Sequence, residues 1–149
     1  MEAESASAKA KCVAIAAAAA LADLACKWAA KSGGLAVDAN AGAAFGLFRS
    51  SPRAVAAAGC LVLALLLLAI LRAARLDFAS RAGLALMAGG AAANLCERLL
   101  WGTVSDWIYL PFSALFCRGG LRFNLADAEI GLGALIFLAA SFCAQRRGA

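Results

Sequence analysis

Four long apolar stretches divide the chain, and shorter segments that carry most of its charges separate them. The clearest stretch covers residues 54–71, which hold no charge and are rich in leucine. The others cover residues 13–28, 82–96 and about 125–144, and each has polar side chains near one end. Because a membrane-crossing helix needs roughly 20 mostly apolar residues, the pattern predicts an all-α polytopic membrane protein with four transmembrane helices.

Composition supports the membrane interpretation. Hydrophobic residues make up 64% of the chain and charged residues 15%, whereas an ordinary soluble domain is about half apolar and a quarter charged. A soluble core built from 149 residues cannot hide that much apolar surface. Buried helices of a soluble bundle are the alternative, which the leucine-rich residues 54–71 disfavour. We therefore expect a single membrane domain over residues 1–149.

Basic residues fall equally on the two sides of this four-helix arrangement. One set is packed into the two tails and the tight connection between the second and third stretches: Lys9, Lys11, Arg72, Arg75, Arg81, Arg146 and Arg147. The other set is spread over the two longer connections: Lys27, Lys31, Arg49, Arg53, Arg98, Arg118 and Arg122. Because basic residues concentrate in short cytoplasmic segments, we expect both termini in the cytoplasm. A cleaved signal peptide is the alternative for the first stretch, but Asp23 inside its apolar part argues against one.

The residue types that the chain lacks exclude several kinds of site. It contains no histidine, which excludes Ser-His-Asp and Cys-His catalysis and any histidine-ligated metal. Its six cysteines form no C-x-x-C pair, so neither a zinc site nor a disulfide framework is predicted. Topology and lipid headgroups explain the net charge of +5. We therefore expect no bound metal, no nucleic-acid partner, and membrane lipids as the surroundings.

The unusual polar residues gather near one predicted membrane face: Asp23, Lys27, Asn40, Asn94, Glu97, Arg98, Asp106, Asn124 and Asp127. Ionisable groups in such places are costly and favour a functional site. Structural roles are the alternative. Asp23 and Lys27 lie four residues apart and can form an ion pair on one helical face. Asn124 and Asp127 fit the cap and the first turn of a helix, and Arg98 can extend to headgroups.

Asp106 and Asp127 form the pair that structural roles explain least well. They are separated by 21 residues, but Asp106 follows the third stretch and Asp127 begins the fourth, so both map to the same membrane face. Two carboxylates that lie close together cannot both ionise easily, and such a pair holds a shared proton. This is the arrangement of aspartic peptidases. It requires no histidine, metal or other nucleophile, which suits this chain.

Five short motifs, in order along the chain, resemble those of lipoprotein signal peptidase, also called signal peptidase II, of bacterial inner membranes. Residues 23–27 (DLACK) resemble the family's D-x-x-x-K, and residues 40–46 (NAGAAFG) resemble N-x-G-x-A-F. Residues 94–98 (NLCER) resemble N-x-x-D-R, residues 102–107 (GTVSDW) G-x-V-x-D-F, and residues 123–127 (FNLAD) F-N-x-A-D. The resemblance covers roughly residues 13–142.

Three positions depart from the family pattern. Glu97 stands where the family usually has aspartate, so the charge is kept but reaches one methylene further. The five donors of Arg98 suit either backbone carbonyls or a pairing with Glu97. Trp107 replaces a phenylalanine or other apolar residue, and Ala93 stands where glycine often precedes the asparagine. None of these changes removes either aspartate of the pair.

The resemblance implies an aspartic endopeptidase without a cofactor. Asp106 and Asp127 correspond to its catalytic dyad. The substrate it implies is a prolipoprotein that carries diacylglyceryl on its lipobox cysteine, cut just before that cysteine. The remaining matched positions correspond to substrate-binding or supporting residues: Asn40, Gly42, Asn94, Glu97, Arg98, Asn124, Ala126, Asp23 and Lys27. We expect a monomer in the bacterial inner membrane, with its active site toward the extracytoplasmic face.

The family fold adds a small extracytoplasmic β-sheet and a mobile loop to the four helices. Residues 35–42 are typical of a short strand that ends near a turn, and the apolar, aromatic residues 107–116 fit either a lid or a fixed interfacial anchor. Two other functions stay open at this stage. One is a small transporter or proton-pathway subunit that uses intramembrane carboxylates. The other is a Ser-Lys peptidase based on Lys27, although no motif supports a particular serine.

Overall fold

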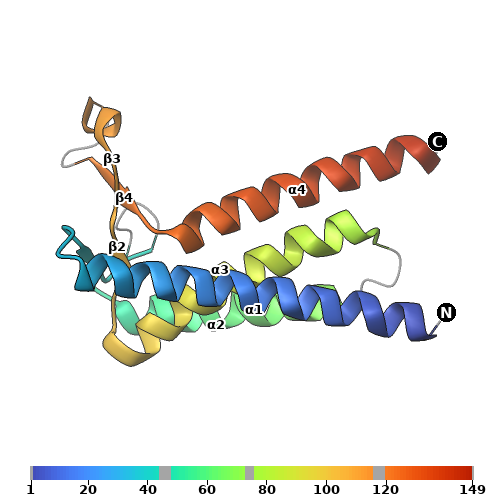
Figure 1. The fold of residues 1–149 in the computed structure, drawn as a ribbon, viewed down its shortest axis with the longest axis horizontal. Helices are drawn as coiled ribbons and strands as arrows, with labels where there is room; N and C mark the ends of the chain where they lie inside the picture. The colour runs from blue at the N-terminus through green and yellow to red at the C-terminus, as the bar shows by residue number, and fades with distance from the viewer. Residues whose placement is uncertain (1, 44–47, 73–75, 116–119, 149) are drawn as a thin grey trace.

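The computed structural model describes residues 2–43, 48–72, 76–115 and 120–148. Within them the chain is mostly helical, with long helices α1 (Glu2–Ser32), α2 (Pro52–Arg72), α3 (Phe78–Trp101) and α4 (Leu125–Gly148). Each predicted apolar stretch lies inside one of these helices, and every helix extends beyond the prediction. Both termini lie at one end of the molecule, where α2 ends and α3 begins, whereas the strands lie at the other end (Figure 1).

Three of the helices are long and apolar enough to cross a membrane: residues Ser7–Ser32, Pro52–Arg72 and Leu125–Arg146. The third predicted span, residues 82–96, is helical but does not belong to this group. The reason lies in its position, because α3 packs against α1, α2 and α4. A helix enclosed by other helices needs small side chains more than a lipid-facing surface. Accordingly α3 holds many buried residues, whereas α2 holds none.

Close backbone approaches fix the neighbours of α3. A Cβ atom at Gly89 would lie 2.5 Å from the carbonyl oxygen of Ala16 in α1, and one at Gly90 would lie 2.6 Å from that of Ala126 in α4. Small residues at such positions let helices approach closely, and Ala85, Gly89 and Ala93 recur at a spacing of four residues along α3. The contact at Gly90 fixes the start of α4, where the candidate site begins.

The α3–α4 contact gives a stability prediction. A Cβ at Gly83 would lie 2.6 Å from the carbonyl oxygen of Gly133 and 2.8 Å from the amide nitrogen of Phe137, both backbone atoms. Gly83→Ala should therefore separate the helices and lower the free energy of unfolding by about 1–3 kcal/mol. Gly131→Ala is the matched control, because no atom lies within 4 Å of a Cβ there. Thermal unfolding in detergent compares the two, and equal unfolding temperatures would contradict this packing.

Two small antiparallel sheets stand at the end of the molecule opposite the termini. Strand β1 (Asp38–Asn40) pairs with β2 (Val104–Asp106), and β3 (Ile108–Leu110) pairs with β4 (Leu121–Phe123). The contact of β2 with β4 joins the two sheets. The predicted strand within residues 35–42 is therefore confirmed, over three residues. The predicted apolar loop 107–116 contains β3 and the short 3₁₀ helix η2 (Pro111–Leu115), and Phe116 lies outside the described residues.

Candidate active site

The β1–β2 pair brings Asn40 next to Asp106. Asp106 lies opposite Asp38 and Asn40 opposite Val104, so Asn40 is a diagonal neighbour of Asp106 on the same face of the sheet. The Asn40 amide Nδ2 donates to Asp106 Oδ2 at 3.1 Å. The Asn40 side-chain oxygen accepts from the backbone N–H of Gly42 at 2.9 Å. Residues 44–46 of the same sequence motif lie outside the described residues.

The start of α4 places Asp127 and Asn124 beside Asp106. Asn124 caps the helix, because its side-chain oxygen accepts from the Asp127 N–H at 3.0 Å, and Asp127 Oδ2 accepts from the Asn124 N–H at 3.3 Å. This reciprocal pair is a capping box, as the spacing of the two residues predicts. The Asn124 amide Nδ2 is then left to donate to Asp106 Oδ1 at 2.7 Å. The cap therefore also links the two aspartates.

A third asparagine reaches Asp127 from α3. Asn94 Nδ2 donates to Asp127 Oδ1 at 2.9 Å, and its side-chain oxygen accepts from Lys27 Nζ at 2.7 Å. In each of the three asparagines, the oxygen is held by a donor, so the NH₂ group must point at a carboxylate. The partners of the oxygens fix these amide orientations, and an aspartate in any of the three positions would repel its neighbour.

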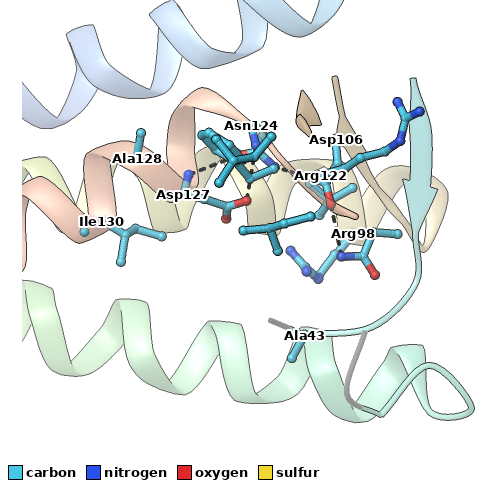
Figure 2. Close-up of a pocket in the computed structure, with 14 residues that line it drawn as sticks. Ala43, Arg98, Asp106, Arg122, Asn124, Asp127, Ala128 and Ile130 are labelled. Carbon is cyan, nitrogen blue, oxygen red and sulfur yellow. Dashed lines mark hydrogen bonds between the residues drawn. The ribbon is translucent and has the colours of Figure 1, made fainter. Parts of the chain in front are cut away.

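Asp106 and Asp127 line one cavity of about 630 Å³. Figure 2 shows them on either side of Asn124, with Arg98 and Ala43 across the opening. Arg98 donates to the backbone carbonyl of Gly42 at 2.9 Å and to that of Asn94 at 3.4 Å. Its buried Nε has no hydrogen-bond partner among the described residues. Arg122 also lines the cavity and donates to the backbone carbonyl of Ala36 at 3.2 Å, so two carboxylates face two guanidinium groups that are bound to backbone carbonyls.

Burial raises the pKa of Asp106 above its ordinary value, because the charged form loses hydration. The amides of Asn40 and Asn124 oppose this shift, whereas the nearby charge of Asp127 adds to it. Asp106 therefore holds a proton at pH values where a free aspartate would lose it. This is the behaviour required of the acid in a carboxylate pair.

The raised pKa of Asp106 predicts a pH-dependent stability. Because the folded protein binds this proton more tightly than the unfolded chain does, protonation stabilises the fold. That contribution is fully present below the ordinary pKa of 3.8 and is lost as the pH rises through the raised value. Wild type should therefore lose stability relative to Asp106→Asn as the pH rises from 3.8. Thermal unfolding of both proteins across this range tests the sign, and a difference that is constant with pH would contradict it.

A buried ion cluster lies next to the two aspartates. Lys27 Nζ lies 2.7 Å from Asp23 Oδ2 and 3.1 Å from Glu97 Oε2, and all three side chains are almost completely buried. Glu97 also pairs with the half-exposed Lys31 at 3.1 Å. The predicted Asp23–Lys27 ion pair is thus confirmed. Lys27 is ion-paired with Asp23 and Glu97 and donates to Asn94, so it is unsuited to act as the base of a Ser-Lys peptidase.

Of the two kinds of partner that suit Arg98, the structure shows backbone carbonyls and not Glu97. Glu97 instead accepts from Ser105, at 2.8 Å from the backbone N–H and at 2.6 Å from the hydroxyl. The two side chains leave neighbouring positions of α3 in different directions, so Glu97 faces α1 and β2 while Arg98 faces the cavity.

The remaining predicted residues do not line the cavity but stabilise the elements that do. Ala126 is completely buried, and its N–H donates to Asp23 Oδ1 at 2.9 Å, which gives the start of α4 a second cap. Ser105 and Lys31 were not predicted as site residues, although the sequence positions of both could have indicated a role. Ser105 precedes Asp106 directly, and Lys31 lies one helical turn after Lys27. Glu129 is also buried in α4, and its Oε2 has no hydrogen-bond partner among the described residues.

Comparisons with solved structures show the fold. One bacterial membrane enzyme, solved in meso at 2.3 Å resolution, superposes with a TM-score of 0.79 over 94% of this chain and 92% of its own, at 19% identity. A second, solved in meso at 1.9 Å resolution, gives a TM-score of 0.74 over 88% of this chain and 92% of its own, at 20% identity.

Sequence comparisons show the family. The Bartonella bacilliformis lipoprotein signal peptidase is 35% identical over 70% of this chain, and the Solibacter usitatus one is 34% identical over 66%. The chain spans 62% of the length of each of these two relatives. A Chlamydia trachomatis lipoprotein signal peptidase is 35% identical over 66% of the chain and 58% of its own length. The family model for signal peptidase (SPase) II matches residues 15–143. The chain therefore belongs to the signal peptidase II family.

Proposed function

We propose that the chain is a membrane-embedded aspartic endopeptidase that removes signal peptides from prolipoproteins. It cuts just before the cysteine that carries diacylglyceryl. The observation that carries the proposal is the pair Asp106 and Asp127, which come from different elements and line one cavity. Family membership supports the substrate, because the similar proteins of several bacteria are named lipoprotein signal peptidases. Nothing in the site favours the alternative of a transporter subunit.

Different environments give the two carboxylates different roles. The raised pKa of Asp106 supports its role as the acid, which leaves the role of base to Asp127. Asp127 takes a proton from a water molecule, and the oxygen of that water attacks the scissile carbonyl carbon. Asp106 gives its proton to the carbonyl oxygen, which forms a gem-diol. The C–N bond then breaks as the nitrogen takes the proton held by Asp127 and a gem-diol hydroxyl returns one to Asp106.

A second cavity supports a lipid-modified substrate. It has a volume of about 470 Å³, lies between α2 and α3, and shares Ala43, Arg98 and Ile130 with the first. Most of the residues that line it are small or apolar: Phe48, Ala54, Val55, Ala58, Gly59, Val62, Ala91 and Leu95. An acyl chain or an apolar helix can therefore lie beside the carboxylates while water reaches them from outside.

We propose four membrane crossings, with α3 as the fourth. Its 24 residues extend for about 36 Å at 1.5 Å per residue, more than the roughly 30 Å of a bilayer core. The termini lie at the end of the molecule away from the site (Figure 1). In this arrangement the tails are cytoplasmic, and the strands and the dyad lie at the extracytoplasmic face of the bacterial inner membrane. The segment that contains η2 then lies at the interface.

Cysteine labelling tests this topology. In a background without native cysteines, Lys9→Cys and Arg146→Cys should react only after the membrane is made permeable. Asp38→Cys and Pro111→Cys should react with an impermeant reagent added from outside, because both positions are exposed. Labelling of the tails from outside would overturn the topology and the side from which the substrate is cut.

Cleavage of a defined substrate tests the activity. The full chain, purified in detergent, should cut a diacylglyceryl-modified prolipoprotein at the single bond before the modified cysteine. The same polypeptide without the lipid is the matched control, and it should be cut far more slowly. Mass spectrometry of both products locates the bond. Absence of cleavage, or equal cleavage of both substrates, would reject the proposed specificity.

A further inference from the structure

We propose that Lys27 is a positioning residue that fixes the two aspartates relative to each other through three arms, which begin at one hydrogen bond and two ion pairs. This inference rests on the proposed peptidase activity and explains how its dyad is held. The ammonium group is buried and has three donors. It donates a hydrogen bond to Asn94 at 2.7 Å and forms ion pairs with Glu97 at 3.1 Å and with Asp23 at 2.7 Å. Each partner then leads to one of the aspartates or to the residue beside it.

The first arm ends on the side chain of Asp127. Lys27 holds the oxygen of Asn94, and this fixes the direction of Asn94 Nδ2, which donates to Asp127 Oδ1 at 2.9 Å. The second arm ends on the backbone beside the same aspartate. Lys27 holds Asp23 Oδ2, while Asp23 Oδ1 accepts from the Ala126 N–H at 2.9 Å. Both the side chain and the helix start of Asp127 are therefore tied to one ammonium.

The third arm ends on the strand that carries Asp106. Lys27 holds Glu97, whose two oxygens accept from the backbone N–H and the hydroxyl of Ser105. Successive side chains of a strand point to opposite faces, so Glu97 contacts the Ser105 side chain on the face of β2 opposite to Asp106. It fixes the strand without occupying the carboxylate of Asp106, which keeps its own contacts with Asn40 and Asn124.

One ammonium therefore links α1 to the three elements that carry or contact the two aspartates: α3, β2 and α4. Displacement of Lys27 would move both aspartates, and a misplacement of about 1 Å costs roughly 100-fold in rate. Lys31 differs in a way that makes it a matched control. It pairs with the same Glu97 at the same 3.1 Å, but its side chain is 46% exposed, and it bonds to neither Asn94 nor Asp23.

The test compares Lys27→Met with Lys31→Met in the full chain, using a diacylglyceryl-modified prolipoprotein. Lys27→Met should lower kcat about 100-fold with KM changed little, whereas Lys31→Met should stay within about twofold. Ser105→Ala keeps every ion pair and removes only the hydroxyl hydrogen bond of the arm to Asp106. This variant should therefore fold even if Lys27→Met does not. It should lower kcat about tenfold, the loss of one hydrogen bond to a charged group. Two coupled carboxylates should give kcat a bell-shaped dependence on pH. In Ser105→Ala the two limbs of the bell should lie closer together, because a displaced Asp106 couples less strongly to Asp127.

Each outcome decides between the alternatives. A wild-type protein that cuts no substrate rejects the peptidase activity itself. If wild type cuts but Lys27→Met keeps its kcat, or Lys31→Met loses as much as Lys27→Met, the positioning role of Lys27 is rejected. If Lys27→Met does not fold, Ser105→Ala decides. An unchanged kcat and pH profile in that variant would leave the cluster with a purely structural role.

Discussion

Asp106→Asn and Asp127→Asn should each lower the rate of cleavage at least about 1,000-fold while the protein still folds and inserts. Each carboxylate has its own proton to move, and positioned acid–base groups contribute about 10²–10⁴-fold. An asparagine can neither accept the proton of the attacking water nor give one to the carbonyl oxygen. The loss should appear in kcat rather than in KM, because both side chains act on the reacting atoms. Initial rates with a diacylglyceryl-modified prolipoprotein measure it.

Asp38→Asn provides the matched control. Asp38 lies opposite Asp106 in the β1–β2 pair, but its side chain is half-exposed and pairs only loosely with Arg49 at 3.7 Å. The same substitution on the same sheet should therefore leave the rate within about twofold, since such surface pairs contribute about 0–1 kcal/mol. Thermal unfolding of all three variants confirms that they are folded. Near-normal turnover by either dyad variant would reject the catalytic assignment.

Glu97→Ala should lower the free energy of unfolding by about 3–5 kcal/mol, because it removes one member of a buried ion pair. Lys27 would keep its charge with only Asp23 as an ionic partner, and the N–H of Ser105 would lose its acceptor. Glu97→Asp should cost less, about 1–3 kcal/mol, since a shorter side chain cannot reach Lys27 and Ser105 equally well. Denaturation in detergent measures both changes.

The comparison variant is Lys31→Ala, which removes the exposed partner of the same carboxylate. Its cost should be about 0–1 kcal/mol, as for other exposed pairs. An unfolding free energy for Glu97→Ala equal to that of wild type would show that the cluster contributes nothing to the fold. It would also remove the support for the arm that leads from Glu97 to β2.

The sequence predicts the parts of the site that depend on local spacing. The apolar stretches lie within the four helices, because long apolar runs have no other stable form in a bilayer. The ion pair of Asp23 with Lys27 follows from their four-residue separation, and the cap of α4 follows from the three residues between Asn124 and Asp127. These contacts join neighbours along the chain, so their geometry is already contained in the helical repeat.

Contacts between distant segments could not be predicted in the same way. Glu97 and Arg98 are adjacent, and nothing local determines which of them faces Lys27, about 70 residues earlier in the chain. The three-residue strands are too short to show an alternation of polar and apolar positions, so the contact of Glu97 with Ser105 could not be predicted. The enclosed position of α3 explains why its residues are less hydrophobic than those of a lipid-facing span. Only the tertiary packing reveals that position.

We propose that two carboxylates, aided by asparagine amides, activate water for peptide hydrolysis without a metal ion. The decisive measurement is single-turnover cleavage of a diacylglyceryl-modified prolipoprotein by the purified full chain, with and without a strong metal chelator. The rates with and without chelator should be equal, and the cut should fall at the bond before the modified cysteine. Cleavage that the chelator abolishes and an added metal ion restores would rule out hydrolysis by the carboxylates alone.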